Sequence, residues 1–147
     1  MKSILLAATA FMFSVVVMAQ AKADDVIKVN VEKYDFGKIK QNVPVIYNFE
    51  IKNTSDKPVV VENSWGSCGC TTPEKPKEPI QPGQTAKLKV QYNAAALNHF
   101  EKDVYIKLAG IEQPKTIKIT GEVLDAAAYD AYAKGSKGDK GKAKGSN

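Results

Sequence analysis

Residues 45–52 have the sequence VIYNFEIK, in which two sets of side chains alternate. Val45, Tyr47, Phe49 and Ile51 fall on one side, and Ile46, Asn48, Glu50 and Lys52 fall on the other. Successive side chains of a β-strand point to opposite faces of its sheet, so a period of two predicts a strand with one buried face.

The same alternation recurs from residue 27 to residue 123 with no helical period in between. Turn sequences separate the runs: NTSDKP at 53–58, Pro82-Gly83, and a loop with Gly110 and Pro114. We therefore predict an all-β fold, an antiparallel β-sandwich of about seven short strands spanning residues 24–124. The further apolar positions are Ile27, Val29, Val31, Val59 to Val61, Leu88, Val90, Tyr92, Val104, Ile106, Leu108, Ile117, Ile119 and Val123.

Prolines recur at every third position between Thr72 and Gly83. They are Pro73, Pro76, Pro79 and Pro82. Polyproline II has three residues per turn, so this spacing favours a stiff, extended segment. We expect the segment to carry the chain from one sheet to the other.

Residues 1–23 have the pattern of a secretory signal peptide. Lys2 precedes an apolar run from Ile4 to Met18, which is too short to span a bilayer, and small residues follow at Ala19-Gln20-Ala21 and Ala21-Lys22-Ala23. No cysteine stands at the cleavage point, as a lipoprotein would require. We predict a periplasmic or secreted protein that does not span the membrane.

Residues 125–147 differ from the sandwich. Leu124 to Lys134 favours a short helix that Gly135 ends, and the lysine- and glycine-rich remainder has nothing apolar to bury and is predicted to be disordered. Such a tail either contacts anionic surfaces or only keeps the protein in solution.

The charge distribution argues against a nucleic-acid partner. All 21 basic residues are lysine, so no arginine fork is present for phosphates or guanines. Residues 24–130 hold 14 lysines against 15 acidic residues, whereas residues 131–147 hold five lysines and one aspartate. The basic pI therefore comes from the two ends of the chain.

Both cysteines and the single tryptophan lie in residues 64–73, SWGSCGCTTP. An exported protein meets an oxidising environment, in which free thiols seldom persist. Cα atoms two apart in an extended strand lie about 6.6 Å from each other, and Gly69 permits the tighter turn that a Cys68–Cys70 disulfide needs. The loop it closes is minimal, so it adds little stability, and its strain makes it easy to reduce.

Three roles fit this pair: a local disulfide in a structural or binding site, a metal site, or thiol–disulfide exchange. We expect no cofactor. The metal alternative is Cu(I) or zinc held by Cys68 and Cys70 with His99, the lone histidine, because soft sulfur suits these ions. Redox exchange usually needs a helix N-terminus to activate a thiol, and the predicted sandwich offers none there.

No catalytic residue is predicted. With one histidine and no serine or aspartate placed to relay a proton with it, a nucleophilic triad has no support. We predict a non-enzymatic module of the cell envelope that binds an unknown protein or a cell-envelope polymer, with Trp65 as the candidate for its binding surface.

Three sequence features resemble one bacterial family, the domain-of-unknown-function family 1573. They are a strand of the type F-x-F-x-N at Tyr47 to Asn53, the Ser-Cys-Gly-Cys-Thr signature at Ser67 to Thr71, and Pro82-Gly83 ahead of the strand Lys87 to Tyr92. The resemblance covers residues 32–108. It implies an immunoglobulin-like sandwich that is often exported, and it implies no established activity. Trp65 and the lysine-rich tail lie outside the family pattern.

Overall fold

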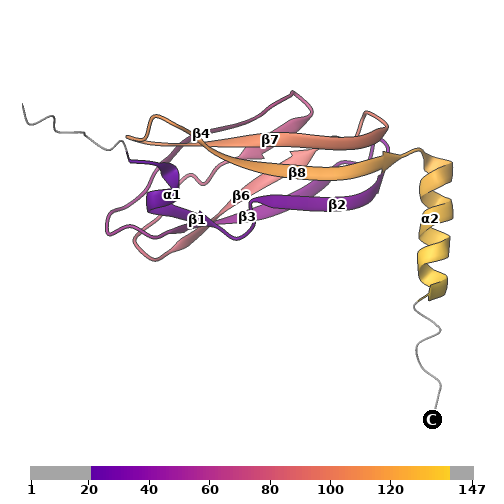
Figure 1. The fold of residues 1–147 in the computed structure, drawn as a ribbon, viewed down its shortest axis with the longest axis horizontal. Helices are drawn as coiled ribbons and strands as arrows, with labels where there is room; N and C mark the ends of the chain where they lie inside the picture. The colour runs from indigo at the N-terminus through magenta and orange to yellow at the C-terminus, as the bar shows by residue number, and fades with distance from the viewer. Residues whose placement is uncertain (1–20, 140–147) are drawn as a thin grey trace, which may run out of the picture.

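The computed structural model describes residues 21–139, in which two four-stranded sheets form a β-sandwich (Figure 1). The β3 sheet has strand order β1-β3-β6-β5, and the β7 sheet has strand order β2-β8-β7-β4. This arrangement confirms the predicted β-sandwich. The elements are α1 (Ala23–Val26), β1 (Ile27–Val29), β2 (Lys33–Lys40), β3 (Val45–Asn53), β4 (Val61–Gly66), β5 (Thr71–Glu74), β6 (Thr85–Tyr92), β7 (Asn98–Leu108), β8 (Lys115–Leu124) and α2 (Ala126–Asp139).

The stretch VIYNFEIK forms most of β3, as its alternation predicts. Phe49 and Ile51 are fully buried, whereas the alternate residues Glu50 and Lys52 are exposed. Tyr47 lies on the same face and stacks on Tyr34 of the other sheet, with 3.5 Å between ring centroids. Each fully buried large apolar side chain stabilises the fold by about 1.5–3 kcal/mol relative to its exposed state.

The core lies between the two sheets and uses the predicted apolar positions of β6, β7 and β8. Residues with no exposed surface come from both sheets, so the sandwich closes over one continuous core. They include Leu88, Val90, Val104, Ile106, Ile117 and Ile119.

Strand β2 departs from the antiparallel pattern that we predicted, because it pairs with β8 in parallel. The register between these strands shifts between Asp35 and Lys38. Gly37 lies in this bulge with a φ of 65°, and its N–H donates a 2.9 Å hydrogen bond to Asp35 Oδ1. The bulge bends β2 at the edge of the β7 sheet.

The proline-rich segment does not cross between the sheets, so that prediction was wrong. Pro73 lies in β5 and faces Val90 of β6, and Ile80 forms an isolated bridge with Val59. Strands β5 and β6 belong to the same sheet. Strand β5 tolerates Pro73 because an edge strand needs ladder hydrogen bonds on one side only.

Helix α2 continues past Gly135 to Asp139, so the predicted end at Gly135 was wrong. A glycine lowers helix propensity but keeps the N–H that the helix requires. Asp125 Oδ1 accepts a 2.8 Å hydrogen bond from the N–H of Ala128, as a helix-capping residue does. Lys40 pairs with Asp130 at 3.0 Å, and Lys38 Nζ lies 5.1 Å from the centre of the Tyr132 ring. Beyond these contacts the helix projects away from the sandwich (Figure 1).

The predicted signal peptide falls almost entirely in residues 1–20, outside the described part of the chain, as does the tail from residue 140. Within residues 21–139, no helix is both long and apolar enough to cross a bilayer.

Candidate functional site

The chain changes sheets at Cys68 to Cys70. Strand β4 ends at Gly66 in the β7 sheet, and β5 begins at Thr71 in the β3 sheet. Backbone hydrogen bonds fix both sides of this corner: Ser67 N–H donates to the carbonyl of Asp103 at 2.9 Å, and Asn93 N–H donates to the carbonyl of Cys70 at 3.0 Å. The two sulfurs therefore lie where the chain crosses between the sheets.

The structure pairs Cys68 with Cys70, and their Cα atoms lie 5.2 Å apart. This separation falls in the normal range for a disulfide. Gly69 does not adopt a left-handed conformation, contrary to the role that the sequence suggested for it. The turn closes instead by a 3.2 Å hydrogen bond from Thr71 N–H to the carbonyl of Cys68.

Thr71 is the residue of this site that sequence reasoning missed. Its side chain is buried, and its Oγ1 lies 3.7 Å from Cys68 Sγ and 3.8 Å from Cys70 Sγ. Disulfide sulfurs carry no proton, so the hydroxyl is the donor, and its single proton can point to either sulfur. The signal was present in the sequence, because Thr71 is the last residue of the Ser-Cys-Gly-Cys-Thr signature.

Trp65 lies on the outer face of the β7 sheet, three residues before Cys68. It is 39% exposed and stacks on Tyr105 of β7, with ring centroids 5.4 Å apart and planes inclined by 26°. The stacking follows from the register, which places the two residues opposite each other. The neighbouring strand therefore holds the exposed indole in one orientation.

A shallow hollow of about 530 Å³ lies beside Trp65. Its other lining residues are Glu62, Asn63, Lys107, Glu112 and Pro114. Lys107 Nζ donates to the carbonyl of Ile111. Within residues 21–139 neither Glu62 nor Glu112 takes part in an ion pair, so the hollow offers hydrogen-bond acceptors around one aromatic ring.

His99 lies in β7, one residue after the start of the strand. It is exposed and faces Glu122 of β8. In the described part of the chain, no three histidine, cysteine or acidic side chains are grouped so that they could hold a metal ion. The structure therefore does not bring His99 together with Cys68 and Cys70 as a ligand set.

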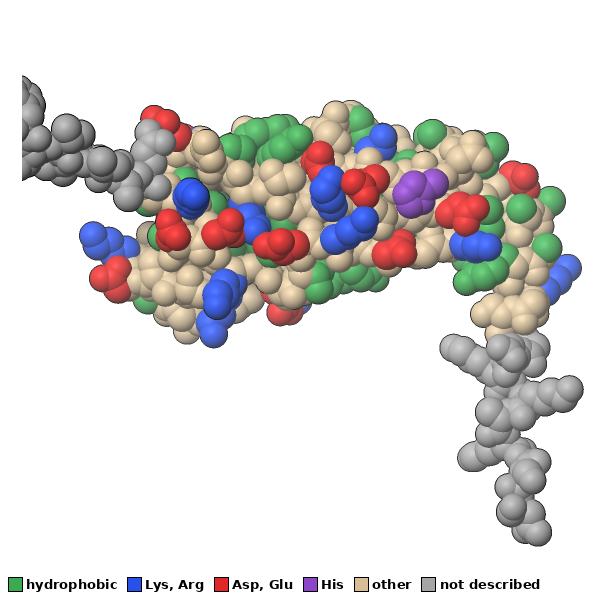
Figure 2. Space-filling model, in the orientation of Figure 1, with side chains coloured by type: hydrophobic (Ala, Val, Ile, Leu, Met, Phe, Trp, Pro, Cys, Tyr) green, Lys and Arg blue, Asp and Glu red, His purple; other side chains and the backbone are tan. Residues whose placement is uncertain are grey.

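Ion pairs cover the outer face of the β7 sheet next to the corner. Lys118 Nζ lies 2.9 Å from carboxylate oxygens of both Glu101 and Asp103, and Lys33 lies 2.9 Å from Glu101. Hydrogen bonds from Lys118 and then Lys33 lower the pKa of Glu101 from 4.5 to about 2, and Asp103 and Glu101 raise the pKa of Lys118. Figure 2 shows charges of both signs interspersed on this face, without a patch of one sign.

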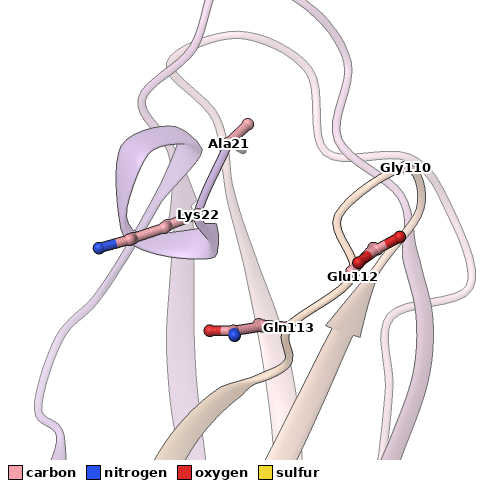
Figure 3. A pocket seen from close by; sticks show the side chains of 5 residues that line it. All are labelled: Ala21, Lys22, Gly110, Glu112 and Gln113. Atoms are coloured by element: carbon pink, nitrogen blue, oxygen red, sulfur yellow. The ribbon is translucent and has the colours of Figure 1, made fainter. Parts of the chain in front are cut away.

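A smaller pocket of about 280 Å³ lies between the start of α1 and the β7–β8 loop (Figure 3). It is lined by Ala21, Lys22, Gly110, Glu112 and Gln113. Glu112 also lines the Trp65 hollow, so the two depressions adjoin.

Lys115 joins α1 to β8 by ion pairs with Asp24 and Glu32. Partial burial would lower the pKa of Lys115, but the hydrogen bonds to these two carboxylates outweigh it and raise the pKa above 10.5. The ion pair between Lys115 and Asp24 holds helix α1 against the end of the sandwich where β8 begins.

Solved structures share this fold at low sequence identity. A protein of unknown function from Porphyromonas gingivalis W83 has 18% identity and a TM-score of 0.57, over 66% of this chain and 46% of that one. The secreted serine protease VesC from Vibrio cholerae has 12% identity and a TM-score of 0.56, over 74% of this chain and 25% of the protease. This chain thus spans under half of either protein.

The ASH / PapD-like domain 7 of human CEP192 matches almost its whole length. The match covers 80% of this chain and 99% of that domain, with 8% identity and a TM-score of 0.54. At such identities the likeness concerns the fold alone, and it confirms the immunoglobulin-like, PapD-like sandwich. No curated protein sequence matches the chain.

One protein family does match in sequence. Its pattern, described as "Protein of unknown function (DUF1573)", covers residues 27–123, which is nearly the whole sandwich and extends beyond the resemblance seen in residues 32–108. The chain therefore belongs to the DUF1573 family of proteins of unknown function.

Proposed function

We propose that this protein is an exported, non-enzymatic binding module of the bacterial cell envelope, and that the surface around Trp65 contacts its partner, a protein or a cell-envelope polymer. Two features support the proposal. Residues 1–23 have the composition of a secretory leader, and an exposed tryptophan stacks on a tyrosine on an outer sheet face.

The orientation of Trp65 is the observation that carries the proposal. Stacking on Tyr105 orders the ring before any partner arrives, so binding costs little side-chain entropy. Tryptophan and tyrosine are also the residues most often found at the energetic centre of binding surfaces.

The hollow beside Trp65 supplies the polar groups that a binding surface needs. Asn63 can donate and accept hydrogen bonds, and Glu62 and Glu112 are acceptors. An aromatic ring with a few polar groups around it fixes both the position and the orientation of a ligand. The carboxylates favour partners that present hydroxyl, amide or amino groups.

Because Trp65 is the only tryptophan, its fluorescence reports directly on this surface. We expect envelope extracts to change the emission of the purified protein, and a Trp65→Ala variant fixed to a resin to lose the component that the wild type retains. The matched control is Ile46→Ala, which removes a similarly exposed apolar side chain, 51% exposed, from the other sheet.

Two results would contradict the proposal. One is retention of the same envelope component by Trp65→Ala and the wild type. The other is an equal loss of retention in Ile46→Ala, since that would indicate non-specific apolar adsorption. Circular dichroism of each variant verifies that the sandwich is folded.

A further inference from the structure

The Cys68–Cys70 disulfide has a feature that a purely structural crosslink does not require. The buried Thr71 hydroxyl lies within 3.8 Å of both sulfurs, and no other side-chain hydrogen-bonding group of the described chain contacts them. Sulfur in a disulfide is a weak acceptor, whereas a thiolate is charged and needs a donor. The hydroxyl therefore suits the reduced or reacting state of the pair better than the oxidised one.

We propose that this disulfide is a thiol–disulfide exchange site for a dithiol on another exported protein, and that Thr71 is the residue that holds the departing sulfur. The proposal is independent of the Trp65 surface, and it adds a covalent step to a protein otherwise proposed only to bind.

The two sulfurs are not equivalent, which sets the direction of attack. Cys70 packs against the hydrophobic core, whereas Cys68 is not among the residues in contact with it. A partner thiolate therefore attacks Cys68 Sγ, forms a mixed disulfide with it and breaks the Cys68–Cys70 bond. The electron pair of that bond leaves on Cys70 Sγ, and the Thr71 hydroxyl donates to the new thiolate.

The second half of the reaction balances the exchange. The mixed disulfide joins Cys68 Sγ to the first sulfur of the partner. The partner's second thiolate attacks that first sulfur, which forms the partner's disulfide and releases Cys68 as a thiolate. Both cysteine sulfurs of this chain then take up the two protons that the partner's thiols gave up. The partner dithiol has been oxidised to a disulfide by two electrons, and Cys68–Cys70 has been reduced to two thiols.

Thr71 replaces the activating group that the fold lacks. Dithiol proteins commonly stabilise a thiolate at a helix N-terminus, and this corner joins two strands, β4 and β5. A hydrogen bond from a hydroxyl to a charged sulfur serves the same purpose, because it lowers the energy of the leaving group.

The corner keeps its shape when the disulfide opens. Its backbone bonds run from Ser67 to Asp103, from Asn93 to Cys70 and from Thr71 to Cys68, and none depends on the sulfur bond. A three-residue loop also constrains the unfolded chain very little, so reduction removes little stability. The pair can therefore cycle without unfolding the sandwich.

The test uses the purified protein with its native disulfide, and dithiothreitol as the dithiol. Samples are quenched with iodoacetamide, and the alkylated thiols are counted by intact mass. We expect Thr71→Val to be reduced about ten- to a hundredfold more slowly than the wild type, since a hydrogen bond to a charged group is lost. Thr71→Ser, which keeps the hydroxyl, should retain the wild-type rate.

Thr72→Val is the matched control, because it removes a neighbouring β-branched hydroxyl that is exposed and contacts neither sulfur. Its reduction rate should equal that of the wild type. The inference is overturned if Thr71→Val reacts as fast as the wild type, if Thr71→Ser is as slow as Thr71→Val, or if Thr72→Val slows equally.

Two further measurements do not depend on Thr71→Val alone. In the reduced proteins, the rate of Cys70 alkylation can be measured as a function of pH. The midpoint of this pH dependence should lie at a lower pH in the wild type than in Thr71→Val. In single-cysteine variants, Cys68 of Cys70→Ser should react faster with a small aromatic disulfide than Cys70 of Cys68→Ser. Equal midpoints, or a faster Cys70, would overturn the assigned roles.

Discussion

Asn53 Nδ2 donates a 2.7 Å hydrogen bond to the carbonyl oxygen of Ile80, which lies 27 positions later in the chain. The same amide nitrogen donates to the carbonyl of Lys57 at 2.7 Å, and Asn53 Oδ1 accepts from the N–H and hydroxyl of Ser55 at 2.8 Å. Asn53 is fully buried. One side chain thus joins the end of β3, the following turn and the segment before β6.

Replacing Asn53 by alanine should destabilise the protein by about 3 kcal/mol, because it removes all four hydrogen bonds that this buried side chain makes. Urea unfolding followed by circular dichroism measures the change. Asn48→Ala is the control, since Asn48 lies on the same strand but is exposed. Equal losses in the two variants would show that the buried hydrogen bonds of Asn53 do not matter.

Gly66→Ala should destabilise the corner, whereas Gly69→Ala should be tolerated. A Cβ at Gly66 would lie 2.6 Å from the carbonyl oxygen of Thr71 and 2.8 Å from its Cβ, while nothing lies within 4 Å of a Cβ at Gly69. Overpacking of this kind costs about 1–3 kcal/mol. Thermal unfolding of both variants tests the prediction, and a larger loss in Gly69→Ala would refute it.

Glu101 should contribute stability that disappears in acid. Because its pKa in the folded protein is about 2, below the ordinary 4.5, the charged form stabilises the fold. This contribution is complete above about pH 4.5 and is lost as the pH falls toward 2. The site is exposed to solvent, so the effect should be modest and should weaken with salt.

The measurement compares the unfolding midpoints of Glu101→Gln and the wild type between pH 7 and pH 2. The difference should be largest near neutral pH and should vanish near pH 2. Glu62→Gln is the control, because Glu62 forms no ion pair in residues 21–139. A difference that grows in acid would contradict the assigned ion pairs.

If the proposed export takes place, we expect the mature protein to begin at Lys22 and not at Asp24. Both positions follow small residues, but Ala23 is only 5% exposed and packs in the core, and the backbone N–H of Lys22 donates to Asp25 Oδ2 at 2.9 Å. An N-terminal amino group at Lys22 would keep this contact and add charge to it. Intact mass of protein secreted by a bacterial host decides between the two, and a start at Asp24 would refute the prediction.

Local patterns predicted most of the strands, but not how they pair. The alternation around Phe49, Leu88 and Val104 identified their buried faces, since burial on one face imposes a period of two. The parallel pairing of β2 with β8 joins segments about eighty residues apart, and no local pattern records it. Strand β5 was missed because prolines argue against a strand, whereas an edge position removes the penalty.

The candidate site was also predictable only in part. The chemistry of sulfur and the single tryptophan indicated Cys68, Cys70 and Trp65, since these residue types are scarce in the chain. Thr71 was overlooked because threonine is common, and only its distance to both sulfurs distinguishes it. His99 was considered for its chemistry, and the register of β7 with β8 places it opposite Glu122.

The two ends of the sandwich differ, because helix α2 lies at one end only. The described chain enters at α1, beside the Glu112 depressions, and leaves at the opposite end of the sandwich (Figure 1). At 1.5 Å per residue, the 14 residues of α2 extend the exit by about 21 Å. A label or a fused protein attached directly after Asp139 would join the molecule at the end opposite the Glu112 depressions, so immobilisation there leaves the Trp65 surface open to a partner.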